Sequence, residues 1–139
     1  IAAGGISDGR TMAAAFALGA EGVQMGTQML SCLESPVHMN WKEAIVNARE
    51  TDTIFLNQKH SPALRALRTE RSERLADMEE NIFGQFGDPQ KLYFGGDMNA
   101  AIALSGQVAG RIDAIRPIAE IIGETVEEFS ETIDRLSDG

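Results

Sequence analysis

Apolar runs and helical stretches alternate twice at the start of the chain. Residues 1–3 and 22–25 are short apolar runs that end at glycines. Apolar residues recur at helical spacing over residues 9–18, and a further helical stretch is expected over residues 26–33. About 20 residues separate the two glycine-terminated runs, a spacing that suits a crossover between neighbouring parallel strands. The pattern predicts two β/α units, which belong to a barrel or to an open sheet.

Helical periodicity continues after the Ser35-Pro36 break but becomes less regular. It predicts a helix over residues 37–49, an extended segment over 51–56 and a second helix over 75–86. Four arginines recur every third residue, with Glu70 and Glu73 among them, which favours a solvated, salt-bridged helix over a site for an anionic partner. These arginines are Arg65, Arg68, Arg71 and Arg74.

The last third of the chain is expected to be helical. Asp97 is a suitable N-cap for a helix over residues 98–104, and Pro117 is a suitable first residue for the final helix. The final helix carries one long apolar stripe and many acidic residues on its other faces, which predicts a solvated acidic face. The stripe consists of Ile118, Ile121, Ile122, Val126, Phe129, Ile133 and Leu136.

Composition and charge exclude several classes of protein. Apolar residues make up 43% of the 139 residues and charged residues 24%, which are ordinary values for a globular protein. The net charge of −9 argues against non-specific binding to nucleic acid or to an anionic membrane surface. The single cysteine, Cys32, excludes an internal disulfide, and no apolar run is long enough to span a membrane. We therefore expect a cytoplasmic location. Ile1 begins within a strand-like run, so we expect a piece of a longer protein.

The glycines that end the two apolar runs are the strongest chemical signal. Glycine lets a ligand approach the backbone closely, and a following helix directs unpaired N–H groups toward an anion. The carboxyl ends of parallel strands are also where β/α folds bind ligands. The pairing predicts a phosphate site, although the same glycines would also permit tight turns alone. The candidate residues are Ala3, Gly4, Gly5, Gln24, Met25, Gly26 and Thr27.

No catalytic residue is predicted within this chain. His38 and His60 lie outside the glycine loops, Cys32 is expected to be a buried core thiol, and Arg10 is expected to form a salt bridge on a helix surface. The His, Cys, Asp and Glu residues lack the spacing of a metal site, so no metal is predicted. Any chemistry must come from a bound cofactor or from residues outside this chain.

Two sequence blocks resemble the nitronate monooxygenase (2-nitropropane dioxygenase) family, which is similar to FMN-dependent enoyl-acyl-carrier-protein reductases. Residues 2–10 (AAGGISDGR) match the family pattern A-G-G-I-x-D-G-R, and residues 19–27 (GAEGVQMGT) match G-A-x-G-V-x-M-G-T. Residues 105–110 (SGQVAG) and the helix after Pro117 are similar to the family's closing segment. The resemblance covers residues 1–35 best and the middle of the chain least.

The resemblance implies the C-terminal part of a (β/α)8 TIM barrel, an α/β fold. Residues 1–35 would supply strands seven and eight with the FMN phosphate loops, residues 36–96 a small, mostly helical substrate-side segment, and residues 97–139 the closing helices. The intact enzyme would oxidise alkyl nitronates with oxygen, and its catalytic histidine would lie upstream of Ile1. The family's bulky aromatic after the G-T pair is Met29 here, which leaves the substrate open.

Three alternatives remain at this point. The same phosphate loops would serve an FMN-dependent enoyl-thioester reductase that uses a nicotinamide donor. They would equally serve a non-flavin barrel that binds a phosphorylated nucleotide or sugar. The apolar stripe of the final helix would suit a freestanding interaction module that forms a homodimer. In the first two cases the partner is a small-molecule substrate.

Overall fold

The computed structural model describes residues 1–138 and shows an α/β chain. Strands β1 and β2 pair in parallel, with Ala2 opposite Val23 and Ala3 opposite Gln24. The two predicted β/α units and their parallel pairing are therefore confirmed. In chain order the first elements are β1 (Ala2–Ala3), α1 (Gly9–Ala17), β2 (Val23–Gln24) and α2 (Gly26–Leu30).

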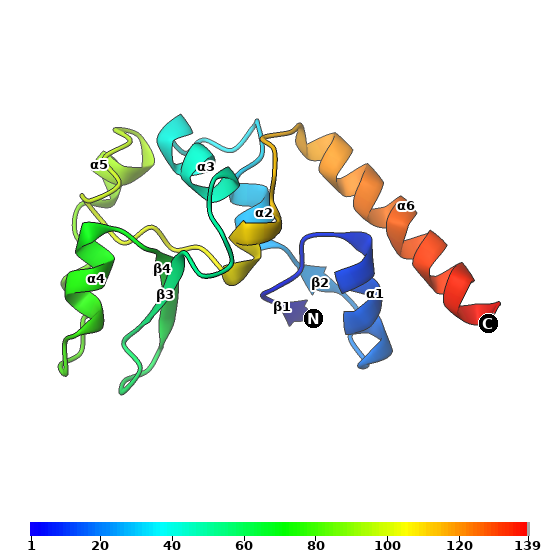
Figure 1. Ribbon diagram of the computed structural model, residues 1–139, viewed down its shortest axis with the longest axis horizontal. Coiled ribbons are helices and arrows are strands. Elements are labelled where there is room, and N and C mark those ends of the chain that lie inside the picture. The colour runs from blue at the N-terminus through cyan, green and yellow to red at the C-terminus, as the bar shows by residue number, and fades with distance from the viewer. Residues whose placement is uncertain (139) are drawn as a thin grey trace.

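After α2 the chain forms a β-hairpin flanked by α4, and it ends in a long helix that lies beside α1, away from the hairpin (Figure 1). Strands β3 and β4 pair antiparallel, and α4 lies against one side of this hairpin. The elements are α3 (Met39–Val46), β3 (Thr53–Leu56), β4 (Leu64–Leu67), α4 (Glu70–Ala76), α5 (Pro89–Tyr93), the 3₁₀ helix η1 (Gln107–Arg111) and α6 (Ile118–Ser137).

The predicted arginine helix is wrong in its first half. Arg65 lies in β4, and Arg68 lies between β4 and α4. Thr69 caps α4 by accepting a hydrogen bond from the backbone of Ser72, whose side chain in turn accepts one from the Thr69 backbone. This reciprocal capping fixes the start of the helix at Glu70. The period-three repeat of arginines therefore crosses a strand, a turn and a helix.

Two further helix predictions, over residues 75–86 and 98–104, are also wrong. Helix α4 ends at Ala76, and the chain then runs without regular structure as far as α5, apart from an isolated bridge at Gly87. The backbone that follows α5 is extended because it pairs with two separate segments: Leu104 forms a bridge with Ala66 of β4, and Ala101 forms one with Gly87, just before α5. Tertiary pairing thus overrides the helical preference of this alanine-rich stretch.

Two apolar clusters form the core. One lies beneath the hairpin and α4 and contains Leu56, Ala66, Leu75, Ile82 and Ile102. The other surrounds the fully buried Trp41 and Ile45 of α3. Its other buried members are Val37, Leu67, Leu92, Ala101, Ala103, Val108, Ala109 and Ile112. The predicted segments 36–96 and 97–139 therefore share a core, while their division into domains stays a prediction.

Helix α6 packs along α1 and reaches away from the rest of the molecule (Figure 1). The rings of Phe16 and Phe129 meet edge to face at 5.1 Å. The apolar stripe is only partly covered, because Ile121 is 2% exposed whereas Val126 is 52% exposed. Gly9 permits the close contact: a Cβ built there would lie 2.2 Å from the backbone nitrogen of Phe129.

Substitution of Gly9 by alanine should loosen the contact between α1 and α6. The added methyl group meets helix backbone rather than a flexible side chain, so we expect a loss of about 1–3 kcal/mol in the free energy of unfolding. Urea denaturation of the purified protein measures this loss. Gly123→Ala is the matched control: its Cβ meets nothing within 4 Å, and removing a glycine from a helix should stabilise by about 0.5–1 kcal/mol. Equal effects of the two substitutions would contradict the packing described.

Candidate functional site

Two loops rich in glycine lie side by side at the carboxyl ends of β1 and β2. The parallel register places Ala3 opposite Gln24, so the residues that follow each strand leave the sheet at the same edge. Gly4 and Gly5 have φ angles of +87° and +75°, a conformation that other residues rarely adopt. A Cβ built at Gly4, Gly5 or Gly26 would meet nothing within 4 Å. The glycine loops, residues 3–5 and 24–27, therefore border open space.

The structure brings together all seven residues predicted for the phosphate site. Most of them are exposed, whereas Met25 and Thr27 are partly buried. Met25 is the N-cap of α2 but its side chain accepts no hydrogen bond from the helix. The first N–H groups of α2 thus lack a side-chain cap beside the glycine loops. The residues are Ala3, Gly4, Gly5, Gln24, Met25, Gly26 and Thr27, and their binding of a phosphate stays a prediction.

Unlike α2, α1 has side-chain caps at its N-terminus. This corrects the expectation that both helices point free N–H groups at the site. Asp8 caps α1 by accepting from the backbone nitrogen of Thr11 at 2.8 Å. The carboxylate of Glu128, from α6, accepts from the backbone nitrogen of Gly9, also at 2.8 Å. Two protein carboxylates therefore occupy this helix end, and an anion placed there would meet like charges.

Charged side chains hold α1 to the closing part of the chain. Arg10 pairs with Glu128 at 3.0 Å, which confirms its predicted surface salt bridge. Arg111 pairs with Asp8 at 2.7 Å. Partial burial acts to raise the pKa of Asp8. Hydrogen bonds from Thr11 and the charges of Arg111 and Arg10 outweigh this effect and hold the pKa of Asp8 below its ordinary value of 3.8.

The closing segment reaches the glycine loops through Gly106, a contact that was not predicted from the sequence. The backbone nitrogen of Gly106 donates to the hydroxyl oxygen of Thr27 at 2.9 Å. The preceding residue, Ser105, is held by Trp41, whose ring nitrogen donates to the serine hydroxyl at 3.2 Å. The S-G-Q-V-A-G motif identified residues 105–110 as similar to the family's closing segment, but nothing in the motif indicated that Gly106 contacts Thr27.

Both histidines have local partners away from the glycine loops. The Nδ1 atom of His38 accepts from the backbone nitrogen of Asn40 at 3.1 Å, and His60 lies 3.0 Å from the carbonyl oxygen of Glu79. Cys32 is 3% exposed, which confirms the predicted buried thiol. Within residues 1–138, no group of three or more His, Cys, Asp or Glu residues could hold a metal ion. No helix in this range has both the length and the apolar character needed to cross a membrane.

A family model and several curated proteins match this chain. The model for nitronate monooxygenase matches residues 1–128. A probable nitronate monooxygenase from Staphylococcus saprophyticus is 40% identical over 82 residues, which are 59% of this chain and 23% of that protein. A probable nitronate monooxygenase from Staphylococcus aureus strain Newman matches with the same identity and coverage. The chain spans about a quarter of the length of these curated relatives.

Solved structures resemble the whole of this chain but extend well beyond it. FabK from Thermotoga maritima matches with a TM-score of 0.88 and 42% identity over 98% of this chain and 45% of that one. A nitroalkane oxidase from Streptomyces ansochromogenes matches with a TM-score of 0.72 and 24% identity over 96% of this chain and 40% of that one. The second likeness shows the shared fold alone. The monooxygenase and oxidase names among these proteins are those of oxidoreductases.

Replacement of Asp8 by alanine should destabilise the protein in a way that depends on pH. At neutral pH the loss of the cap and of the Arg111 pair should cost about 1–2 kcal/mol. Because the folded-state pKa of Asp8 lies below 3.8, the contribution of its charge is full above that pH and falls as the pH drops through the folded-state pKa. Urea denaturation at several pH values measures the difference from the wild type. A difference that grows toward acid pH would contradict the assignment.

Proposed function

The chain belongs to the nitronate monooxygenase family, and from that premise we propose that its protein is an FMN-dependent oxidoreductase that oxidises alkyl nitronates with oxygen. In this proposal β1 and β2 are strands seven and eight of a (β/α)8 barrel. The likeness to FabK and to the nitroalkane oxidase supports that placement, since both structures continue well beyond the matched part. The part of the enzyme described here would hold the cofactor, while the rest of the barrel would supply the acid–base residue.

The observation that carries the proposal is the open space beside the paired glycine loops. A Cβ at Gly5 or Gly26 would project into this space, where a phosphate needs close access to backbone N–H groups. The phosphate of FMN fits the site because the first turn of α2 has no side-chain cap and the Thr27 hydroxyl keeps its proton for donation. The last two loops of a (β/α)8 barrel commonly hold a phosphate.

In this proposal the residues of the chain anchor and orient, and FMN supplies the electron transfer when it is bound. The backbone of Gly4, Gly5 and Gly26 would bind the phosphate, with Thr27 as a side-chain donor. The bond from Gly106 to Thr27 fixes the orientation of that hydroxyl oxygen. Since both histidines have local partners outside the loops, we assign no proton transfer to residues 1–138.

An FMN-dependent enoyl-thioester reductase is the second candidate. It is supported by the likeness to FabK, which extends over 98% of this chain at 42% identity. The curated nitronate monooxygenases are similarly identical but match only 59% of the chain. The two activities would use the same phosphate loops, so the loops themselves do not separate them. They differ in the substrate, and the turnover assay below tests that difference.

Gly26→Val should remove FMN without unfolding the protein. Its φ lies outside the left-handed region and its Cβ meets nothing, so the new side chain would occupy only the space assigned to the phosphate. Visible flavin absorbance per mole of purified full-length protein should fall to a small fraction of the wild-type value, with circular dichroism unchanged. Gly22→Val, at the other end of β2, is the matched control and should keep its flavin. Full flavin content in Gly26→Val would refute the phosphate site.

Turnover by the full-length protein decides between the two substrates. We expect oxygen consumption with propane-2-nitronate and little oxidation of NADH or NADPH in the presence of an enoyl thioester. An oxygen electrode and the loss of nicotinamide absorbance measure the two reactions. The reverse pattern would exclude the nitronate proposal in favour of the reductase. The absence of flavin from active protein would exclude both.

A further inference from the structure

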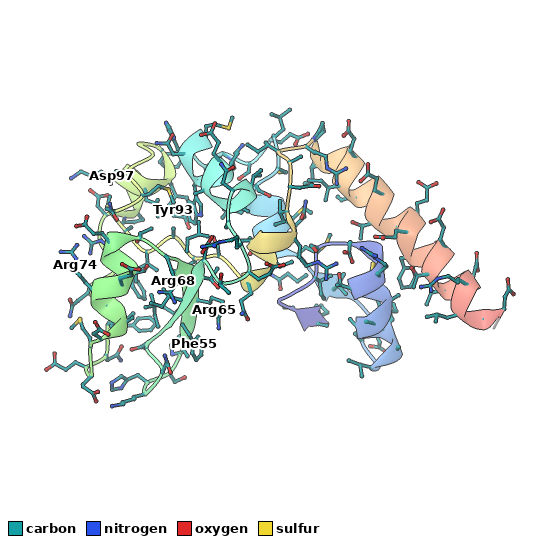
Figure 2. The ribbon with its side chains drawn as sticks, in the orientation of Figure 1. Phe55, Arg65, Arg68, Arg74, Tyr93 and Asp97 are labelled. Atoms are coloured by element: carbon teal, nitrogen blue, oxygen red, sulfur yellow. The ribbon has the colours of Figure 1, made fainter. Side chains whose placement is uncertain are left out.

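The β3–β4 hairpin has one apolar face and one face that carries an arginine. In an antiparallel pair, residues directly opposite each other point to the same side. Leu56 is opposite Leu64 on the side that contacts α4, where Leu56 belongs to the buried cluster. Phe55 is opposite Arg65, and this pair occupies the other side. Figure 2 shows Phe55 and Arg65 together on the side of the hairpin away from α4.

Arg65 is held in place by two contacts within the hairpin. Its guanidinium carbon lies 5.4 Å from the centre of the Phe55 ring, and its Nη1 atom donates to the hydroxyl of Thr53 at 3.1 Å. The Arg65 side chain is partly buried, and the cation–π contact and the hydrogen bond fix the orientation of its guanidinium group. Only one of the five guanidinium N–H groups is used in these contacts.

The charge of Arg65 has no acidic partner within 4 Å among the described residues. Arg68 differs because it has an acidic partner, and Arg71 differs because two of its donors are already bound to backbone carbonyl oxygens. Arg68 pairs with Glu73 at 3.7 Å, and Arg71 donates to the carbonyl oxygens of Asn99 and Gln85. A partly buried cation that is oriented but lacks a counter-ion is suited to bind an anion from outside the chain.

The backbone of Arg65 is linked to the glycine loops through two consecutive residues. Its carbonyl oxygen accepts from the backbone nitrogen of Ser105 at 3.1 Å. The next residue, Gly106, donates to the hydroxyl of Thr27 at 2.9 Å. The hairpin, the closing segment and the proposed phosphate loop thus form one continuous set of contacts. The backbone of Arg65 is therefore separated from the Thr27 contact by only two consecutive residues of the closing segment.

We propose that Arg65 binds the oxyanion group of the substrate that reacts at the flavin. The inference depends on the proposed function, because it requires a substrate at the cofactor held by the glycine loops. A nitronate carries its negative charge on two oxygens bonded to one nitrogen, and the guanidinium fork binds such paired oxygens with two parallel hydrogen bonds. The phosphate of a nicotinamide donor presents the same chemistry. The exposed ring of Phe55 holds the guanidinium group of Arg65 in its orientation.

Steady-state kinetics of the full-length, FMN-loaded protein test the inference. Arg65→Gln should raise the KM for propane-2-nitronate about 10- to 100-fold, the loss expected for a charge-assisted pair, with a smaller change in kcat and unchanged flavin content. Arg65→Lys should recover part of the loss, because it restores the charge without the fork. Arg68→Gln is the matched control: it removes the same charge from a side chain already paired with Glu73, and its KM should equal that of the wild type.

Each outcome separates this inference from the proposed function. A KM raised for NADH or NADPH but not for the nitronate would support an oxyanion site at Arg65 and count against nitronate as the substrate. Unchanged KM values for both, in folded Arg65→Gln with full flavin, would overturn the inference and leave the proposed function standing. If Arg65→Gln fails to fold, Arg65→Lys decides: a raised KM supports the site, and a wild-type KM overturns it.

Discussion

The parallel pairing of β1 with β2 is the constraint on which the candidate site depends. The two strands are only two residues long, yet their register brings two separate glycine loops to the same edge. A shift of one residue would move Gly26 out of line with Gly4 and Gly5 and turn the strand side chains over. The crossover helix α1 makes this register possible, and α1 is in turn fixed by its contact with α6.

The N-termini of α1 and α2 differ in the charged groups that surround them. At α1 the carboxylates of Asp8 and Glu128 satisfy backbone N–H groups, and Arg10 and Arg111 balance their charge. At α2 no side chain caps the helix, and the neighbouring glycines leave the backbone open. The first end joins α6 to α1, and the second is left open beside the glycine loops, where we propose the phosphate binds. The same fold element thus stabilises the structure in one copy and carries the proposed function in the other.

The sequence predicted those elements whose residues near one another in the chain already favour the structure that the folded protein adopts. The glycines of the two β/α units indicated the ends of β1 and β2, which depend on nearby residues, and the long apolar stripe of α6 indicated a helix. The sequence could not predict β4 or the extended backbone at residues 101–104, because these are set by pairing with distant segments. The Gly106–Thr27 bond joins residues 79 apart in the chain, and no local pattern records such a contact.

The position of the FMN phosphate in a crystal structure of the full-length, flavin-loaded protein tests the central claim most directly. We predict that its oxygens lie within hydrogen-bonding distance of the backbone nitrogens of Gly5 and Gly26 and of the Thr27 hydroxyl. A phosphate bound elsewhere, or a Gly5–Gly26 edge filled by protein side chains, would contradict the assignment. The same structure would also show whether the guanidinium of Arg65 faces the flavin, since its backbone is joined to the closing segment at Ser105.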